Sequence, residues 1–406
     1  MSNNNKTPAI RFKGFTDTWE QRKFSELTEI RSASRVHKEE WQSSGVPFYR
    51  SSDVMAALNG TENEKAFISE ELYEKLSAVS GKLEKGDILV TGGGSVGKPY
   101  IVPNNEPLYT KDADLLWVKN NEKLVPYFIY TFFFSPAFSD YLNSVSHVGT
   151  IAHYTITQLE ETPITLPCVS EQQKIGDYFR NIDSLISLYQ RKYDKLIQFK
   201  AAMLKKMFPQ NGADKPEIRF KGFTDAWEQR KLGECAEFNP KSELPDIFEY
   251  VDLESVVGTD ILSHRTESKS SAPSRAQRLA QKGDVFYQTV RPYQKNNCIF
   301  ENDENNWVFS TGYAQLRPVN DGYFLLTLLQ NEDFVKLVLD RCTGTSYPAI
   351  NSNDLADIDV NIPINNLEQQ RIGDYFRNLD SLITLHQRKC DKYKSIKSGL
   401  IRKLFP

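Results

Sequence analysis

The chain has 406 residues, of which 39% are hydrophobic and 25% charged, and this is the composition of an ordinary globular protein rather than a disordered one. Its length suits two to three domains, each with a core of its own. The net charge of −3 excludes neither nucleic acid nor protein as a partner, because binding depends on where the charges lie and not on their sum.

Other features lead us to expect a cytoplasmic protein without a membrane anchor. The five cysteines are dispersed and form no Cys-x-x-Cys pair, as expected of reduced thiols. The first residues lack the charged and apolar regions of a signal peptide. The most apolar run, residues 127–138, is too short to span a bilayer, and we expect it to form a buried helix, as does the matching run 323–334.

Two segments of the chain occur twice. Residues Ile10–Lys23 return as Ile218–Lys231 with one difference in fourteen positions, and Glu171–Leu196 return as Glu368–Tyr393 with six differences in twenty-six. The stretches between these matched blocks share little. A period near 200 residues indicates duplicated domains rather than a solenoid.

Each long matched segment has the pattern of a coiled-coil helix. Its seam positions are spaced alternately four and three residues apart. In the first copy they are Ile175, Phe179, Ile182, Ile186, Tyr189, Tyr193, Leu196, Lys200, Met203 and Met207; in the second they are Ile372, Phe376, Leu379, Ile383, His386, Cys390, Tyr393, Lys397, Leu400 and Leu404. We expect the two helices to pair antiparallel within the chain, about an approximate two-fold axis. The alternative is that each helix packs on its own insert.

The inserts are expected to share a mixed fold of helices and strands. Runs 87–91, 115–119 and 284–288 are strand-like, and 69–77 is helical. Gly86-Asp87 and Gly283-Asp284 open equivalent strands. The sequence therefore predicts an α+β protein with variable domains at 1–170 and 210–367 and matched helices at 171–209 and 368–406.

The loop Gly92–Lys98, GGGSVGK, resembles a phosphate-binding P-loop but departs from it. The next residue is Pro99 instead of Ser or Thr, and a strand-like run follows where a P-loop needs a helix. We expect no nucleotide here. The loop is either a plain turn or a contact to nucleic-acid phosphate, with Gly94, Ser95 and Lys98 as candidates and Lys111 beside them.

The equivalent place in the second insert carries a different set of side chains. Arg, Gln and Lys contact base edges and phosphates, and Tyr stacks or bonds a phosphate. The candidates are Gln288, Arg291, Tyr293, Gln294 and Lys295, and in the last loop of each insert His147, Thr150, His153 and Tyr154, and Thr345, Ser346 and Tyr347. The alternative is that these are solvated polar loops.

Signals for catalysis are weak throughout. Pro245-Asp246 followed by Glu267-Ser268-Lys269 fits a loose nuclease pattern that arises by chance in most chains of this length. The five histidines are dispersed and give no metal-ligand spacing. We expect no catalytic residue and no metal on this chain.

Two variable domains alternating with two copies of an EQQ-(K/R)-IGDYFRN-(I/L)-DSLI helix resemble the specificity subunit of type I restriction-modification systems. The resemblance covers essentially the whole chain. It implies two target-recognition domains, each reading one half of a bipartite site in double-stranded DNA, and a coiled coil that sets the spacer and docks two modification subunits.

The resemblance also implies where the chemistry lies. S-adenosylmethionine, ATP and Mg²⁺ are expected on partner subunits and none on this chain, and restriction subunits join through the complex. Two other functions remain open, a coiled-coil scaffold for proteins and a stand-alone DNA-processing enzyme.

Overall fold

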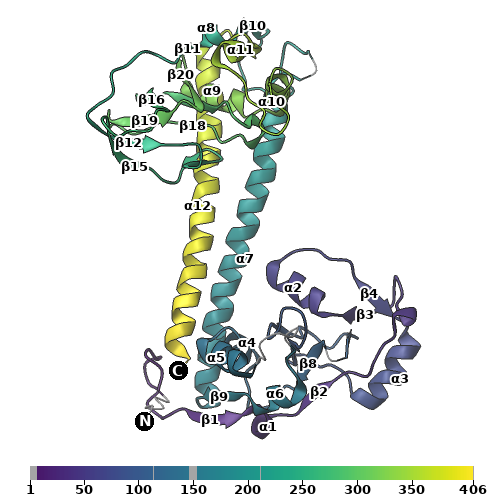
Figure 1. Cartoon of the computed structure of the whole chain (residues 1–406). Coiled ribbons are helices and arrows are strands. Elements are labelled where there is room, and N and C mark those ends of the chain that lie inside the picture. Colours follow the sequence, from purple (N-terminus) through teal and green to yellow (C-terminus); the bar gives the residue numbers. More distant parts are fainter. Residues whose placement is uncertain (1–6, 113, 146–152, 211, 406) are drawn as a thin grey trace. The chain divides into compact units, whose positions relative to one another are not determined.

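The chain divides into two compact units in a computed structural model that describes residues 7–112, 114–145, 153–210 and 212–405. Unit 1 consists of residues 1–189 and 388–406, and unit 2 of residues 190–387. Two long helices, α7 (Val169–Lys206) and α12 (Asn366–Leu404), each contribute residues to both units (Figure 1). Each unit therefore combines one insert with parts of both matched helices.

Unit 1 builds its insert from short strands and helices. A four-stranded antiparallel sheet has the order β2-β8-β5-β6, a three-stranded sheet has the order β4-β3-β7 with β3 and β7 parallel, and β1 pairs with β9. The strands are β1 (Glu20–Lys23), β2 (Ile30–Ser32), β3 (Val46–Tyr49), β4 (Ala66–Ile68), β5 (Ile88–Thr91), β6 (Pro99–Ile101), β7 (Tyr109–Thr110), β8 (Leu115–Val118) and β9 (Pro163–Leu166). The helices are α1 (Phe24–Leu27), η1 (Lys38–Glu40), α2 (Ser51–Asn59), α3 (Glu70–Ser80), α4 (Pro126–Phe132), α5 (Pro136–Val145) and α6 (Ile156–Glu161).

Unit 2 repeats this plan with different loops. Its sheets have the orders β11-β20-β17-β18 and β15-β12-β19-β16, with β12 and β19 parallel, and the pairs β10-β21 and β13-β14. The strands are β10 (Glu228–Lys231), β11 (Ala236–Phe238), β12 (Ile247–Val251), β13 (Val256–Val257), β14 (Asp260–Ile261), β15 (Arg265–Ser268), β16 (Ala276–Leu279), β17 (Val285–Gln288), β18 (Cys298–Ile299), β19 (Trp307–Ser310), β20 (Tyr313–Pro318) and β21 (Asp359–Ile362). The helices are α8 (Leu232–Cys235), η2 (Pro292–Gln294), α9 (Gly322–Leu329), α10 (Glu332–Leu339) and α11 (Ser352–Ala356).

The predicted α+β class and the shared fold of the two inserts are confirmed. The expected strands at 87–91, 115–119 and 284–288 correspond to β5, β8 and β17. One expectation is wrong. The apolar run 127–138 forms most of α4 and the start of α5 instead of one helix, because Pro136 has no N–H to donate to a preceding turn and instead occupies the first position of α5. The run 323–334 is divided in the same way between α9 and α10.

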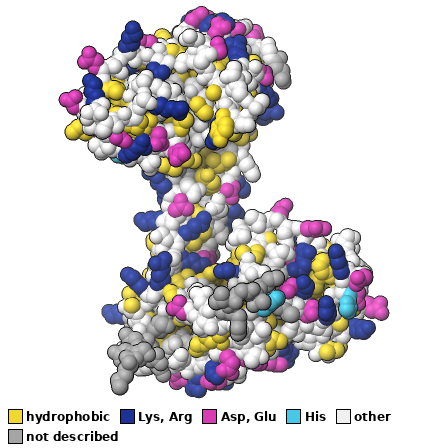
Figure 2. All heavy atoms as spheres, in the orientation of Figure 1, with side chains coloured by type: hydrophobic (Ala, Val, Ile, Leu, Met, Phe, Trp, Pro, Cys, Tyr) yellow, Lys and Arg dark blue, Asp and Glu magenta, His cyan; other side chains and the backbone are white. Residues whose placement is uncertain are grey.

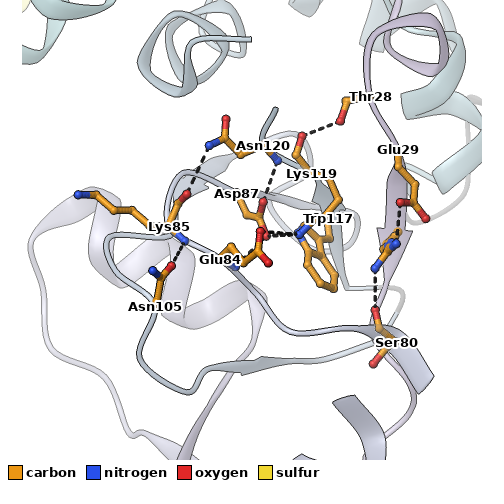
Figure 3. Close-up of polar contacts among 11 residues, drawn as sticks. Thr28, Glu29, Ser80, Glu84, Lys85, Asp87, Asn105, Trp117, Lys119 and Asn120 are labelled. Atoms are coloured by element: carbon orange, nitrogen blue, oxygen red, sulfur yellow. Dashed lines mark hydrogen bonds and ion pairs between the residues drawn. The ribbon is translucent and has the colours of Figure 1, made fainter. Parts of the chain in front are cut away.

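A buried aspartate organises the start of the central strand in unit 1. Asp87 is fully buried, and Figure 3 shows its carboxylate beside Trp117, Lys119 and Asn120. It accepts hydrogen bonds from the Trp117 indole N–H at 2.8 Å and from the Asn120 backbone N–H at 2.7 Å. Lys119 Nζ lies 3.4 Å away and supplies the opposite charge that a buried carboxylate requires.

Unit 2 has the same device with other partners. Asp284, 1% exposed, accepts from the side-chain amide of Gln315 at 2.7 Å and from Arg317 Nε at 2.9 Å. The repeated Gly-Asp dipeptide therefore has a structural role in both units. Its aspartate is buried and hydrogen-bonded, and its glycine, Gly86 or Gly283, adopts a positive φ.

The matched helices pack in two ways along their length. In unit 1 the first seam residues of α7, Ile175, Phe179 and Ile182, lie in one core with the insert, with Leu404 at the end of α12 and with Phe405 after it. Ile186 and Leu400 pack against this core from its edge. The expected helix pairing and its alternative, packing on the insert, thus both occur.

Farther along α7 the seam is formed between the helices. In unit 1 the Tyr189 ring stacks on that of Tyr393 with centroids 5.7 Å apart, and Asp183 Oδ1 lies 2.6 Å from Lys397 Nζ, so the two segments run antiparallel. In unit 2 the core contains the seam residues Ile372, Phe376, Leu379 and Ile383, with Tyr193 and Leu196 packed against it. His386 is half-buried at the position that the spacing predicted.

The invariant letters of the repeated helix have structural roles in each unit. Glu171, fully buried, receives two hydrogen bonds from the Arg11 guanidinium at 2.8 and 2.7 Å. Glu368 receives the same pair from Arg219 at 2.6 and 2.8 Å. In each unit, therefore, the arginine of the short matched block pairs with the glutamate of the long one.

A tyrosine, an aspartate and a lysine repeat in the same way. In unit 1 Asp183 accepts from the Tyr127 hydroxyl at 2.7 Å and pairs with Lys397 of α12. Burial, and then the Asp183 charge, raise the pKa of Tyr127, so its hydroxyl stays protonated and donates. In unit 2 the same three groups are Tyr323, Asp380 and Lys200. Here α12 supplies the aspartate and α7 the lysine, the reverse of unit 1.

Candidate nucleic-acid interface

The Gly92–Lys98 loop of unit 1 is a turn between the antiparallel strands β5 and β6. The Thr91 hydroxyl holds it from within, donating to the Ser95 carbonyl and accepting from the Lys98 backbone N–H at 2.8 Å. Gly94 adopts φ +70° at the exposed tip. The strand β6 follows directly, as the strand-like run after the loop led us to expect, so the loop lacks the helix N-terminus on which a P-loop depends.

Three candidate segments of unit 1 come together around this turn. The Gly92 N–H donates to the Asp114 carbonyl at 2.8 Å, and the Gly92 carbonyl accepts from the Tyr154 N–H at 2.7 Å. Lys111 pairs with Asp114 at 2.6 Å. His153 is exposed, and a Cβ placed on the neighbouring Gly93 would lie 3.7 Å from its Nδ1.

Not every candidate of unit 1 can face a ligand. Tyr154 is 1% exposed, and its hydroxyl is bonded to that of Thr162 within the core, so the expectation that it contacts DNA is corrected. The aromatic ring is a core residue that fixes the end of the loop. His147 and Thr150 lie outside the described residues.

In unit 2 the loop after β17 is anchored by polar side chains that point inward. Gln288 is 2% exposed, and its backbone N–H donates to Asn297 Oδ1 at 2.8 Å. Its side-chain amide donates to Gln294 Oε1 at 2.8 Å and to the Val290 carbonyl at 2.7 Å. The expected contact of Gln288 with DNA is therefore also corrected, since its amide positions the loop. Asn297, which sequence reasoning missed, has the same role.

Two cationic residues of this loop adopt the left-handed backbone conformation. Arg291 has φ +54° and Lys295 has φ +55°, and Asn239 is the third non-glycine residue with positive φ in the described part of the chain. Such conformations cost free energy and are retained at sites where the surrounding structure imposes them. Here they flank η2 and leave its residues Tyr293, 49% exposed, and Gln294 at the surface.

The last loop of the second insert lies against the loop that follows β17. The Arg291 N–H donates to the Pro348 carbonyl at 2.7 Å, and its guanidinium lies 4.3 Å from the centroid of the Tyr347 ring. Tyr347 is 63% exposed, and Thr345 and Ser346 beside it are exposed as well. The structure thus gathers an arginine, two tyrosines and several hydroxyls on one surface, the groups that contact phosphates and base edges.

Lys295 has a partner that no sequence pattern predicts. Its ammonium forms an ion pair with Glu332, the exposed first residue of α10. Glu332 is 37 positions away in the sequence, and an acidic residue at the start of a helix is ordinary. The pair is a surface one, 25% and 76% exposed, and a phosphate can displace the carboxylate.

The face shown in Figure 2 carries no single large patch of one charge. On the face shown in Figure 2, Lys and Arg are interspersed with Asp and Glu in both units, consistent with the net charge of −3. Among the described residues, no group of three or more His, Cys, Asp or Glu is arranged to hold a metal ion. Within the same residues, we find no helix whose length and apolar character would let it cross a membrane.

Comparison with known proteins points to one family. The Type I restriction modification DNA specificity domain matches residues 16–198 and again 215–392. The HindI specificity subunit, a type I restriction enzyme component of Haemophilus influenzae, is 24% identical over 192 residues, which are 44% of this chain and 40% of that protein. The chain thus spans about two fifths of the length of this relative.

Two further relatives align over most of their length. The MjaIX specificity subunit, a type I restriction enzyme component of Methanocaldococcus jannaschii, is 22% identical over 79% of this chain and 77% of its own. The crystal structure of the S subunit of a type I restriction-modification system from M. genitalium has the same fold, with a TM-score of 0.62, 17% identity, and coverage of 98% of this chain and 99% of that one. With both halves matched by the same domain, the chain belongs to the family of type I restriction-modification DNA specificity proteins.

Proposed function

We propose that this chain is the DNA-reading subunit of a type I restriction-modification complex, and that each unit reads one half of an asymmetric bipartite site. One observation carries the proposal. The two units share their framework down to individual ion pairs, Arg11 with Glu171 and Arg219 with Glu368, while the loops at the ends of β5 and β17 differ in sequence and in shape. One framework with two different loop sets suits one task on two targets.

The exposed loop residues divide by chemistry. Arg291 reaches base edges or phosphates through a planar guanidinium, and Lys295 acts as a point charge toward phosphate. The remaining exposed candidates of unit 2 are Tyr293, Gln294, Thr345, Ser346 and Tyr347; the candidates of unit 1 are the exposed Gly94, Ser95 and His153 and the half-buried Lys98 and Lys111. Phosphate contacts would supply affinity, and the differing side chains would supply the sequence preference.

The remaining roles fall to the regions expected from the sequence. Residues 1–170 and 210–367 hold the two target-recognition domains, and the helices at 171–209 and 368–406 set the spacer and dock two modification subunits. Restriction subunits join through the assembled complex. The chain itself is non-catalytic, and S-adenosylmethionine, ATP and Mg²⁺ are bound by those partners.

The test is to map methylated adenines in the DNA of cells that carry this protein and its modification subunits. Replacing residues 24–170 with the corresponding insert of another member should change one half-site and leave the other intact. The matched control replaces residues 232–367 and should change only the opposite half. If an exchange altered both half-sites, or left both unchanged, independent reading by the two units would be refuted.

Two further measurements, on the assembled complex and on the purified chain, test the two alternative functions. A scaffold for proteins would show no salt-dependent binding of duplex DNA by the assembled complex. A stand-alone nuclease would cut DNA as a purified chain with Mg²⁺ alone, whereas a reading subunit leaves the DNA intact.

A further inference from the structure

A groove of about 820 Å³ in unit 1 is not accounted for by the reading loops. It lies between the insert and the C-terminal part of α12. Its lining includes residues at the end of α2, Lys98 of the β5–β6 loop, Tyr130 and Phe134 of the insert, and Lys394 and Arg402 of α12. Insert and matched helix therefore contribute to one surface.

The charges that line this groove are unequal. Four cations, Lys98, Lys394, Lys397 and Arg402, face a single carboxylate, Asp183. Lys397 already neutralises Asp183 at 2.6 Å. For Lys98, Lys394 and Arg402, the described residues include no carboxylate within ion-pair distance, and Arg402 donates instead to the Ser398 hydroxyl at 3.0 Å. Three positive charges are left for a ligand.

The rest of the lining suits an anion whose charge is spread along a chain. The Lys397 ammonium lies 5.2 Å from the Phe134 ring centroid and 5.8 Å from that of Tyr130, so these rings hold its position. Hydroxyls of Ser139, Ser187 and Ser398 stand along the same groove. Lysine, arginine and hydroxyl groups are the usual donors to nucleic-acid phosphates.

The matched helix of the other copy shows which of these cations the framework needs. Lys397 corresponds to Lys200, and both hold the aspartate and tyrosine of their unit. Lys394 corresponds instead to Ile197, although the matched block ends only one position before each. Lys394 has no ion pair with a described residue, so the framework does not explain its charge.

We propose that this groove holds phosphates of the DNA backbone beside the half-site that unit 1 reads, so that α12 is a DNA-contacting element as well as a framework helix. The inference rests on the proposed function and adds to it a named phosphate site. Its cations come from both sides of the groove, Lys98 from the loop already proposed to touch DNA and Lys394 and Arg402 from the helix.

The test uses the full chain assembled with its modification subunits and a duplex of random sequence, so that only backbone contacts are measured. The variant replaces Lys98, Lys394 and Arg402 together with glutamine. Each lost phosphate contact lowers the slope of log affinity against log salt by about 0.9, so the slope should fall by about 2 to 3. The matched control, Lys392→Gln, removes one charge from α12 outside the groove and should leave the slope unchanged.

A second variant checks that charge and not folding is responsible. Lys394→Arg with Arg402→Lys keeps the charges and should keep the wild-type slope. A triple variant that binds with the wild-type slope would overturn the phosphate site. A control that lowers the slope by a third as much as the triple variant would show that the effect depends on net charge alone, and would overturn the site too. If the wild-type complex bound no duplex at all, the proposed function itself would fail, and the inference with it.

Discussion

Replacing Arg11 with methionine should destabilise unit 1 by about 3 kcal/mol, because it leaves the buried Glu171 carboxylate without its partner. The carboxylate loses two hydrogen bonds from a charged donor, at 2.8 and 2.7 Å, and each such bond contributes about 1.5–3 kcal/mol. Breaking a buried ion pair from one side costs about 3–5 kcal/mol. The lower figure applies because the Arg11 side chain is 13% exposed, so water can reach the vacated place.

The measurement is urea unfolding of the full chain, with hydrogen exchange used to assign each transition to a unit. Arg11→Met should lower the stability of unit 1 alone, and the matched variant Arg219→Met should do the same to unit 2. The double variant Arg11→Met with Glu171→Gln should recover part of the loss, since no uncompensated charge remains. A loss below about 1 kcal/mol in either single variant would contradict this expectation, because it would show that the pair contributes no more than an exposed surface ion pair.

Three further predictions concern the helices and the loops. Gly373→Ala should destabilise unit 2 by about 1–3 kcal/mol or more, because the new methyl would lie 2.1 Å from the carboxylate that caps α9. Gly176→Ala should destabilise unit 1 by less, because its methyl would lie no closer than 3.2 Å to any atom. Thermal unfolding of both variants would measure the difference. Lys295→Ala should reduce the salt slope of DNA binding by about one and leave the methylated sequence unchanged, and an unaltered slope would remove this residue from the interface. Four residues inserted into both long helices, after Tyr189 and after Gln387, should add about 6 Å of helix without altering either unit, so the methylated half-sites should persist with a spacer longer by one or two base pairs.

The framework could be predicted because its signals are periodic or repeated. The four-and-three spacing located both long helices, and the Gly-Asp dipeptides located β5 and β17. The sequence could not show that Ile175 and Phe179 belong to the core of the insert while Tyr189 faces a tyrosine of the other helix. Both environments bury the same face of a helix, so they produce the same periodicity.

The candidate site was predicted by location and less well by residue. The loops after β5 and β17 were found because they are polar and differ between otherwise similar halves. Tyr154 and Gln288 were then misassigned, since a tyrosine or glutamine that supports a loop from inside looks the same in sequence as one that faces a ligand. Only burial separates the two cases.

The same limit explains why the groove beside α12 was not anticipated. Arg402 lies in the last turn of α12, where the helix dipole favours a cation, and Lys394 lies on the same long basic helix, where an exposed lysine needs no ligand. Lys98 lies nearly 300 positions earlier in the chain. What joins them is the antiparallel return of α12 to unit 1, which places the last turns of the chain beside the first insert. In this duplicated chain, each unit is completed by the long helix of the other copy. Surfaces such as this groove therefore combine residues that are far apart in the sequence, and their unpaired charge is recognised only in the folded structure.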